Sequence, residues 1–214
     1  MIRLSKPHML ENMMLNIPKD HKKIKAQIHR YERALKKELD EYGCYDDGAG
    51  KRYMIGPLYL ILGDVAGAMK SYKWFKENFP DDSGLPIHFL CWALALYRSG
   101  DLKAAQKKLL QTMFSNLYLI PHLLGYDQGI LDVEHSSNWE SKEYLNFIPV
   151  EILELWNEEE LKWAKKVYDD TNTQKLRDWY IAIEKLSIDE RPGSVRSKLV
   201  EDASKMQNLD FEGS

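Results

Sequence analysis

The histidine and cysteine side chains are the groups in this sequence that could ligate a metal ion or act as nucleophiles. The chain has 214 residues, with six histidines and two cysteines. No histidine forms an HExxH pair or another helical two-ligand spacing with a carboxylate. Cys44 and Cys91 belong to no CxxC motif, and two thiols cannot build the disulfide framework of a small secreted domain. The sequence therefore predicts no metal site and no cofactor.

The segment 126–143 is the region where polar side chains could converge on a small molecule. It is polar and contains glycine, and loops of about a dozen residues are often functional. His122 precedes it, and His135 and Glu140 lie within it, so acid–base chemistry would be available if folding brought these groups together. No phosphate-binding loop and no GxSxG motif accompanies them. We therefore do not expect the protein to be an enzyme. The alternative hypothesis is an enzyme or small-ligand receptor that uses 126–143.

A basic stripe follows the helix-forming segment 20–42 and could bind an anionic partner. Its members recur at helical steps and are Lys22, Lys25, His29, Arg33 and Lys36. Glu32 and Glu38 partly neutralise the stripe, and a solvated helix face is the interpretation that we prefer. The net charge of −3 and the pI of about 6.1 do not favour nucleic acid, because nucleic-acid binders are normally more basic. An accessory subunit that contacts nucleic acid through this stripe is the third hypothesis.

Apolar side chains recur at helical spacing in most of the chain, and no segment alternates with a period of two over a useful length. The clearest helix lies at 20–42, where Asp20 is a good N-cap and Gly43 fits the residue that ends a helix. Asn157 and Glu160 form a capping-box-like pair ahead of a later helix. These patterns predict an all-α protein.

An internal repeat occupies the middle of the chain. The pairs Gly63-Asp64 and Gly100-Asp101 are 37 positions apart, and each pair lies between two apolar helical patterns. An alanine follows each glycine by five positions, at Ala68 and Ala105, and a bulky side chain follows four positions later. The repeat predicts two similar helical hairpins.

With these residues, the stretch from about 50 to 119 resembles two tetratricopeptide repeats. The residues at the family's small, aromatic, apolar and proline positions are Ile55, Gly56, Tyr59, Ala68, Tyr72 and Pro80 in the first repeat, and Phe89, Trp92, Ala93, Leu96, Ala105 and Leu109 in the second. The resemblance implies tandem antiparallel helical hairpins stacked as an α–α superhelix, in which small residues let helix backbones approach closely. Arg52 departs from the family pattern, which has a large apolar residue there. Pro57 falls inside the expected first helix, where it would kink the helix or mark its start.

The expected organisation is a single helical domain with short flanking segments. It comprises an irregular arm at 1–18, the domain at 19–206 and a frayed tail at 207–214. Within the domain, the helix at 19–43 and the helices at 140–206 are expected to cap the ends of the array at 50–119. Thr171 or Asn172 is expected to cap one of these C-terminal helices.

The resemblance also implies a binding groove on the first helices of the repeats. Carried onto this chain, its positions are Tyr53, Met54, Leu60, Leu90, Leu94, Tyr97 and Arg98. They predict an apolar groove for a helix or an extended peptide, unless the chain's own N-terminal helix or C-terminal region fills it. The clamp for C-terminal carboxylates found in some members is not expected, because Tyr53, Pro57 and Cys91 stand at its positions. The first hypothesis is therefore a scaffold that binds a partner protein or peptide, as a monomer or a homodimer.

Membrane attachment is not expected either. The longest apolar stretches are far too short to span a bilayer, and the first residues contain no continuous apolar leader. These features favour a cytoplasmic location.

Overall fold

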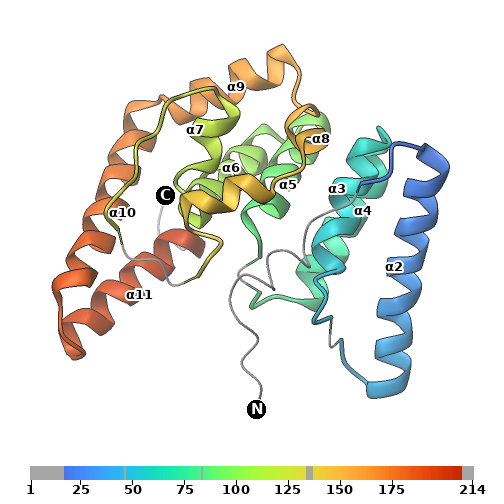
Figure 1. The fold of residues 1–214 in the computed structure, drawn as a ribbon, viewed down its shortest axis with the longest axis horizontal. Coiled ribbons are helices and arrows are strands. Elements are labelled where there is room, and N and C mark those ends of the chain that lie inside the picture. The colour runs from blue at the N-terminus through green and yellow to red at the C-terminus, as the bar shows by residue number, and fades with distance from the viewer. Residues whose placement is uncertain (1–16, 46, 83, 134–136, 209–214) are drawn as a thin grey trace.

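The computed structural model describes residues 17–208 apart from 46, 83 and 134–136, and these residues form helices and no strand. The elements are α2 (His21–Tyr42), α3 (Arg52–Ile61), α4 (Val65–Asn78), α5 (Pro86–Arg98), α6 (Leu102–Ser115), α7 (Leu119–Leu123), the 3-10 helix η1 (Lys142–Phe147), α8 (Val150–Leu153), α9 (Glu158–Tyr168), α10 (Thr171–Asp189) and α11 (Ser194–Asn208). Figure 1 shows α2 at one edge, α3 to α6 in the middle, and α10 and α11 at the other edge. The predicted all-α class is confirmed for this part of the chain. Residues 1–16 of the predicted arm and 209–214 of the predicted tail lie outside it.

Helix α2 begins and ends at the predicted residues. The Asp20 carboxylate accepts hydrogen bonds from the backbone N–H groups of Lys22 at 2.7 Å and Lys23 at 3.1 Å. At the other end, Gly43 adopts a φ of 70° and its N–H donates to the Leu39 carbonyl at 2.9 Å. The apolar face of α2, with Ile24, Ile28 and Leu35 buried, packs on α3.

Two hairpins repeat with the spacing seen in the sequence. The second helices, α4 at 65–78 and α6 at 102–115, are offset by 37 residues at both ends. Each follows a glycine with positive φ, 73° at Gly63 and 88° at Gly100, a conformation that glycine adopts without strain. In each hairpin, the aspartate after the glycine caps the second helix. Asp64 accepts from the Gly67 N–H at 2.7 Å, and Asp101 accepts from the Ala104 N–H at 3.0 Å. The sequence repeat is thus also a structural repeat.

The two helices of the first hairpin approach closely at Gly56. A Cβ atom at this position would lie 2.5 Å from Cζ of Tyr72, so only glycine fits without displacing that ring. The buried alanines Ala68 and Ala105 also present no side chain beyond Cβ at their helix interfaces. The predicted packing role of these small residues is confirmed.

Pro57 lies inside the continuous helix α3, which begins at Arg52, so the proline does not mark the start of the helix. Because proline has no N–H, it cannot donate to the carbonyl of Tyr53, four residues earlier. That carbonyl instead accepts a hydrogen bond from Nδ1 of His88 on α5 at 3.1 Å. A carbonyl oxygen only accepts, so Nδ1 of His88 carries the proton and the ring is held in one tautomer. A bond missing from α3 is thereby replaced by a bond between the two hairpins.

Aromatic rings surround His88 and join the hairpins over a wider area. Its ring centroid lies 5.1 Å from that of Tyr72 and 4.5 Å from that of Phe75, both on α4. Tyr72 in turn stacks on Trp92 of α5 at 5.0 Å with an interplanar angle of 6°. Within the described residues, Nε2 of His88 is buried without a hydrogen-bond partner. Burial lowers the pKa of His88 from 6.5 to about 4, although the hydrogen bond to Tyr53 opposes this.

Arg52, the residue that departs from the family pattern, is held by two carboxylates. Its guanidinium lies 3.1 Å from the buried carboxylate of Asp47 and 2.8 Å from that of Asp82. The hydroxyl of Tyr53 donates to Asp82 at 2.7 Å, and the guanidinium also lies over the Tyr53 ring, 4.3 Å from its centroid. Asp47 further accepts from the backbone N–H groups of Lys51 and Arg52, each at 2.8 Å. The network ties the loop before α3 to the start of that helix.

The helices after residue 140 cover the array on two sides. Helices α9, α10 and α11 pack on α6, while α8 packs on α3. The predicted capping box of α9 is confirmed, because Asn157 and Glu160 exchange hydrogen bonds of 2.9 Å and 3.0 Å. The predicted caps of α10 are wrong by one or two positions. The carboxylate of Asp170 caps this helix, and Thr171 is its first residue.

A double-mutant cycle tests the exchange of hydrogen bonds at Tyr53. We expect His88→Leu to lower the free energy of unfolding by about 1–3 kcal/mol, because a buried acceptor is left unpaired. In a Pro57→Ala background the same change should cost about 1 kcal/mol less, since residue 57 then has an N–H that can reach the carbonyl. Urea unfolding of the four proteins measures the coupling. Equal losses in the two backgrounds would show that His88 does not serve this carbonyl.

The low pKa of His88 predicts acid sensitivity. The unfolded chain binds a proton at this residue below pH 6.5, whereas the folded chain does so only below about pH 4, so folding stability falls as the pH drops through this window. Over the window, wild type should lose about 3 kcal/mol more than His88→Gln, which keeps a donor but does not titrate. Chemical unfolding at several pH values measures both proteins. Parallel pH profiles would contradict the prediction.

Candidate functional site

The predicted groove on the first helices is not open to a partner. Five of its seven predicted residues are buried and belong to the core, namely Tyr53, Met54, Leu60, Leu90 and Leu94. The remaining two, Tyr97 and Arg98, are partly exposed at the end of α5. The expectation of an accessible groove at these positions is therefore corrected.

Residues 155–163 of the same chain contact the end of α5, where Tyr97 and Arg98 lie. The guanidinium of Arg98 pairs with the Glu160 carboxylate at 2.7 Å and donates to the Leu155 carbonyl at 2.6 Å. The ring of Tyr97 lies 4.7 Å from that of Trp163. Glu160 thus caps α9 and anchors it to α5 at the same time. Two of the side chains expected to bind a partner, Tyr97 and Arg98, instead contact the C-terminal segment.

The predicted basic stripe lies along α2 and its five members are all exposed. Nδ1 of His29 lies 3.3 Å from Oε2 of Glu32, within hydrogen-bond distance. Lys36 differs from the other members, because it also lines a cleft between helices.

The described part of 126–143 offers little room for a ligand. His122 is exposed, Glu140 is partly buried, and His135 lies outside the described residues. The two cavities that Glu140 lines measure about 60 and 10 Å³, room for a few water molecules at most. These cavities do not support a small-ligand site in this segment.

A larger cleft, which we call the α2 cleft, lies between α2, α3 and α4 and measures about 320 Å³. Its lining residues are Glu32, Leu35, Lys36, Leu39, Tyr45, Ile55, Tyr59, Gly67, Lys70, Ser71 and Trp74. Leu35 of α2 and Ile55 of α3 are buried. Leu39 is 39% exposed, which is unusual for a leucine beside an apolar wall. The cleft is therefore a mainly apolar surface that water can reach.

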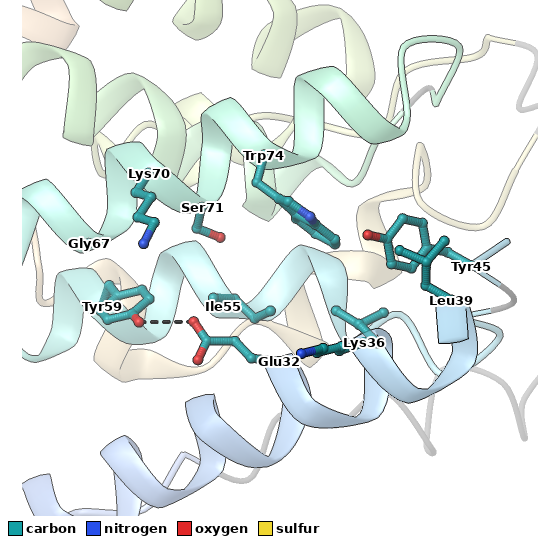
Figure 2. Close-up of a pocket in the computed structure, with 11 residues that line it drawn as sticks. Glu32, Lys36, Leu39, Tyr45, Ile55, Tyr59, Gly67, Lys70, Ser71 and Trp74 are labelled. Carbon is teal, nitrogen blue, oxygen red and sulfur yellow. Dashed lines mark hydrogen bonds between the residues drawn. The ribbon is translucent and has the colours of Figure 1, made fainter. Parts of the chain in front are cut away.

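One end of the α2 cleft is polar and fixed in position. Figure 2 shows the Tyr59 hydroxyl turned toward Glu32, to which it donates a hydrogen bond of 3.0 Å. Burial and then the neighbouring Glu32 raise the pKa of Tyr59 to about 12, so the phenol keeps its proton at neutral pH. Because Glu32 accepts from Tyr59 through one oxygen and pairs with His29 through the other, both of its oxygens are engaged.

The other end of the α2 cleft is aromatic. The Tyr45 and Trp74 rings meet edge to face, with centroids 5.4 Å apart. Phe79 supports both rings from behind, at 5.2 Å from Tyr45 and 5.5 Å from Trp74. This cluster fastens the loop after α2 to the end of α4 and gives the cleft a rigid wall.

Two lysines enter the α2 cleft from opposite walls, Lys36 from α2 and Lys70 from α4 (Figure 2). Both are exposed, and neither has an ion-pair partner in the described residues. The cleft thus combines an apolar floor with two ammonium groups that are available to a ligand.

The second hairpin explains why the first one has a cleft. With the offset of 37 residues, Ser71 corresponds to Lys108 and Ile55 corresponds to Trp92. The Lys108 side chain lies across the Trp92 ring, with Nζ 3.9 Å from its centroid, and donates to Gln111 at 2.7 Å. Burial lowers the pKa of Lys108 to about 8, which shows how far it is removed from water. The residue at the corresponding position of the first hairpin is the small Ser71, which is buried and lines the α2 cleft.

Comparisons with family models, curated proteins and solved structures gave no match. Among the helices of the described residues, none has the length and apolar character to cross a membrane.

Proposed function

We propose that this chain is a scaffold of tetratricopeptide-like hairpins that binds a segment of a partner protein in the α2 cleft. The observation that carries the proposal is the α2 cleft itself, a mainly apolar space between α2, α3 and α4 that the small Ser71 lines, whereas the corresponding position of the next hairpin carries Lys108. A volume of about 320 Å³ suits one or two large side chains and lies at the lower limit for small-molecule sites.

The walls of the α2 cleft support a protein ligand. Its floor and its Trp74 end are apolar and aromatic, which is the composition of interface hot spots. Helices α2 and α4 each pack on α3, so the cleft runs between two helices with a third as its floor. Such a trough can receive apolar side chains from a helix or an extended segment.

The position of the α2 cleft also suits a scaffold. Within the described residues, α2 forms one edge of the molecule, opposite α10 and α11 (Figure 1). A partner could therefore bind there without displacing any described element.

Filling the α2 cleft tests this function. Ser71→Met places an uncharged side chain, one atom shorter than lysine, at the position that corresponds to Lys108 in the second hairpin. We expect the affinity for the native partner to fall about tenfold or more, because the methionine occupies the volume that the partner's side chain would enter. Affinity capture from the native host, compared with wild type, identifies the partner, and calorimetry with the purified partner measures the change.

Ser197→Met is the control for the added methionine side chain, since Ser197 is exposed on α11, away from the cleft, whereas Ser71 is buried. Circular dichroism and thermal unfolding verify that both variants fold. If a partner binds wild type and Ser71→Met equally well while both proteins are folded, the α2 cleft is not its binding site and the proposal fails.

A further inference from the structure

The charges around the α2 cleft indicate the chemistry of its ligand. The two ammonium groups, Lys36 and Lys70, have no ion-pair partner in the described residues. Glu32 is the one acidic residue in the lining, and both of its oxygens are engaged by Tyr59 and His29. A ligand therefore meets two lysines without ion-pair partners in the described residues and one carboxylate that already accepts a hydrogen bond from Tyr59, so positive charge exceeds negative charge in the lining.

The positive surface continues beyond the cleft. The exposed basic stripe runs along α2 from Lys36 through Arg33, His29 and Lys25 to Lys22 at steps of three and four residues. At the rise of an α-helix, this stripe extends about 21 Å from the cleft. Its length corresponds to about four helical turns, so a ligand seated in the cleft could follow it over that distance.

The apolar floor restricts the class of anion. Leu35, Leu39 and Ile55 offer no hydrogen bonds to a sugar–phosphate backbone, but they suit a large apolar side chain. A protein segment can carry apolar and acidic side chains at once, with the former directed into the cleft and the latter toward the lysines. The net charge of the whole chain, −3, also argues against a general nucleic-acid surface.

We infer that the α2 cleft takes an acidic amphipathic peptide segment, which inserts one large apolar side chain and places carboxylates beside Lys36 and Lys70. The inference rests on the proposed function and adds to it the chemical class of the partner. Electrostatic complementarity of this kind selects partners and speeds their association more than it strengthens binding.

Selection from a displayed library of random peptides tests the inference. Peptides of about 16 residues are long enough for about four helical turns. The library is selected on full-length wild type after depletion on Ser71→Met, so that peptides bound outside the cleft are removed. We expect the recovered peptides to share a large apolar residue flanked by Asp or Glu. Their binding, measured by fluorescence anisotropy, should weaken as salt is added.

Charge reversal provides the decisive comparison. The double variant Lys36→Glu/Lys70→Glu should bind the selected acidic peptides about tenfold more weakly, and it should select basic peptides from the same library. The control is Lys73→Glu/Lys107→Glu, which changes two exposed lysines outside the cleft lining by the same net charge and should leave the affinity within about twofold.

The outcomes separate the two proposals. Recovery of neutral or basic peptides by wild type, or equal binding by both double variants, would overturn the acidic class while leaving the cleft as a peptide site. Failure to recover any peptide that depends on Ser71 would overturn the proposed function itself. Displacement of the selected peptides by a single-stranded oligonucleotide that binds Ser71→Met as tightly as wild type would assign the basic stripe to nucleic acid and reject the inference.

Discussion

The hydrogen bond from His88 to the Tyr53 carbonyl is the interaction on which the arrangement of the hairpins depends. Pro57 frees this carbonyl inside α3, and a buried acceptor without a partner would be costly. His88 on α5 supplies the donor, and the surrounding aromatic rings exclude water. Helix α3 is thereby fixed against α5, and the helices α2 and α4 that pack on α3 are positioned with it. The walls of the α2 cleft thus follow from a bond in the core.

A small difference between two similar hairpins creates the candidate site. The hairpins share their offset, their turn glycines and their capping aspartates. They differ around this site, where Ile55 and Ser71 correspond to Trp92 and Lys108, and the Lys108 side chain lies over the Trp92 ring. Repetition therefore supplies a stable framework, while smaller side chains in the first hairpin accompany a cleft that water and a partner can reach.

Local sequence patterns predicted where the helices begin and end better than they predicted how the helices pack. Asp20, Gly43 and the Asn157–Glu160 box mark helix ends because capping depends on neighbours in sequence. Local patterns could not predict that the C-terminal segment contacts Arg98, since Arg98 and its partner Glu160 are 62 residues apart. Only Lys36 of the α2 cleft was among the predicted site residues. The exchange of Ser71 for Lys108 was visible in the aligned repeats, but its effect on volume depends on how α2 packs.

Hydrogen exchange of the chain, alone and bound to its native partner, tests the central claim most directly. Binding in the α2 cleft should slow exchange in its two walls, at 32–39 on α2 and 67–74 on α4. Residues 90–98 should change little, because the chain already covers them. Slower exchange confined to α10 and α11, with both cleft walls unaffected, would contradict this account.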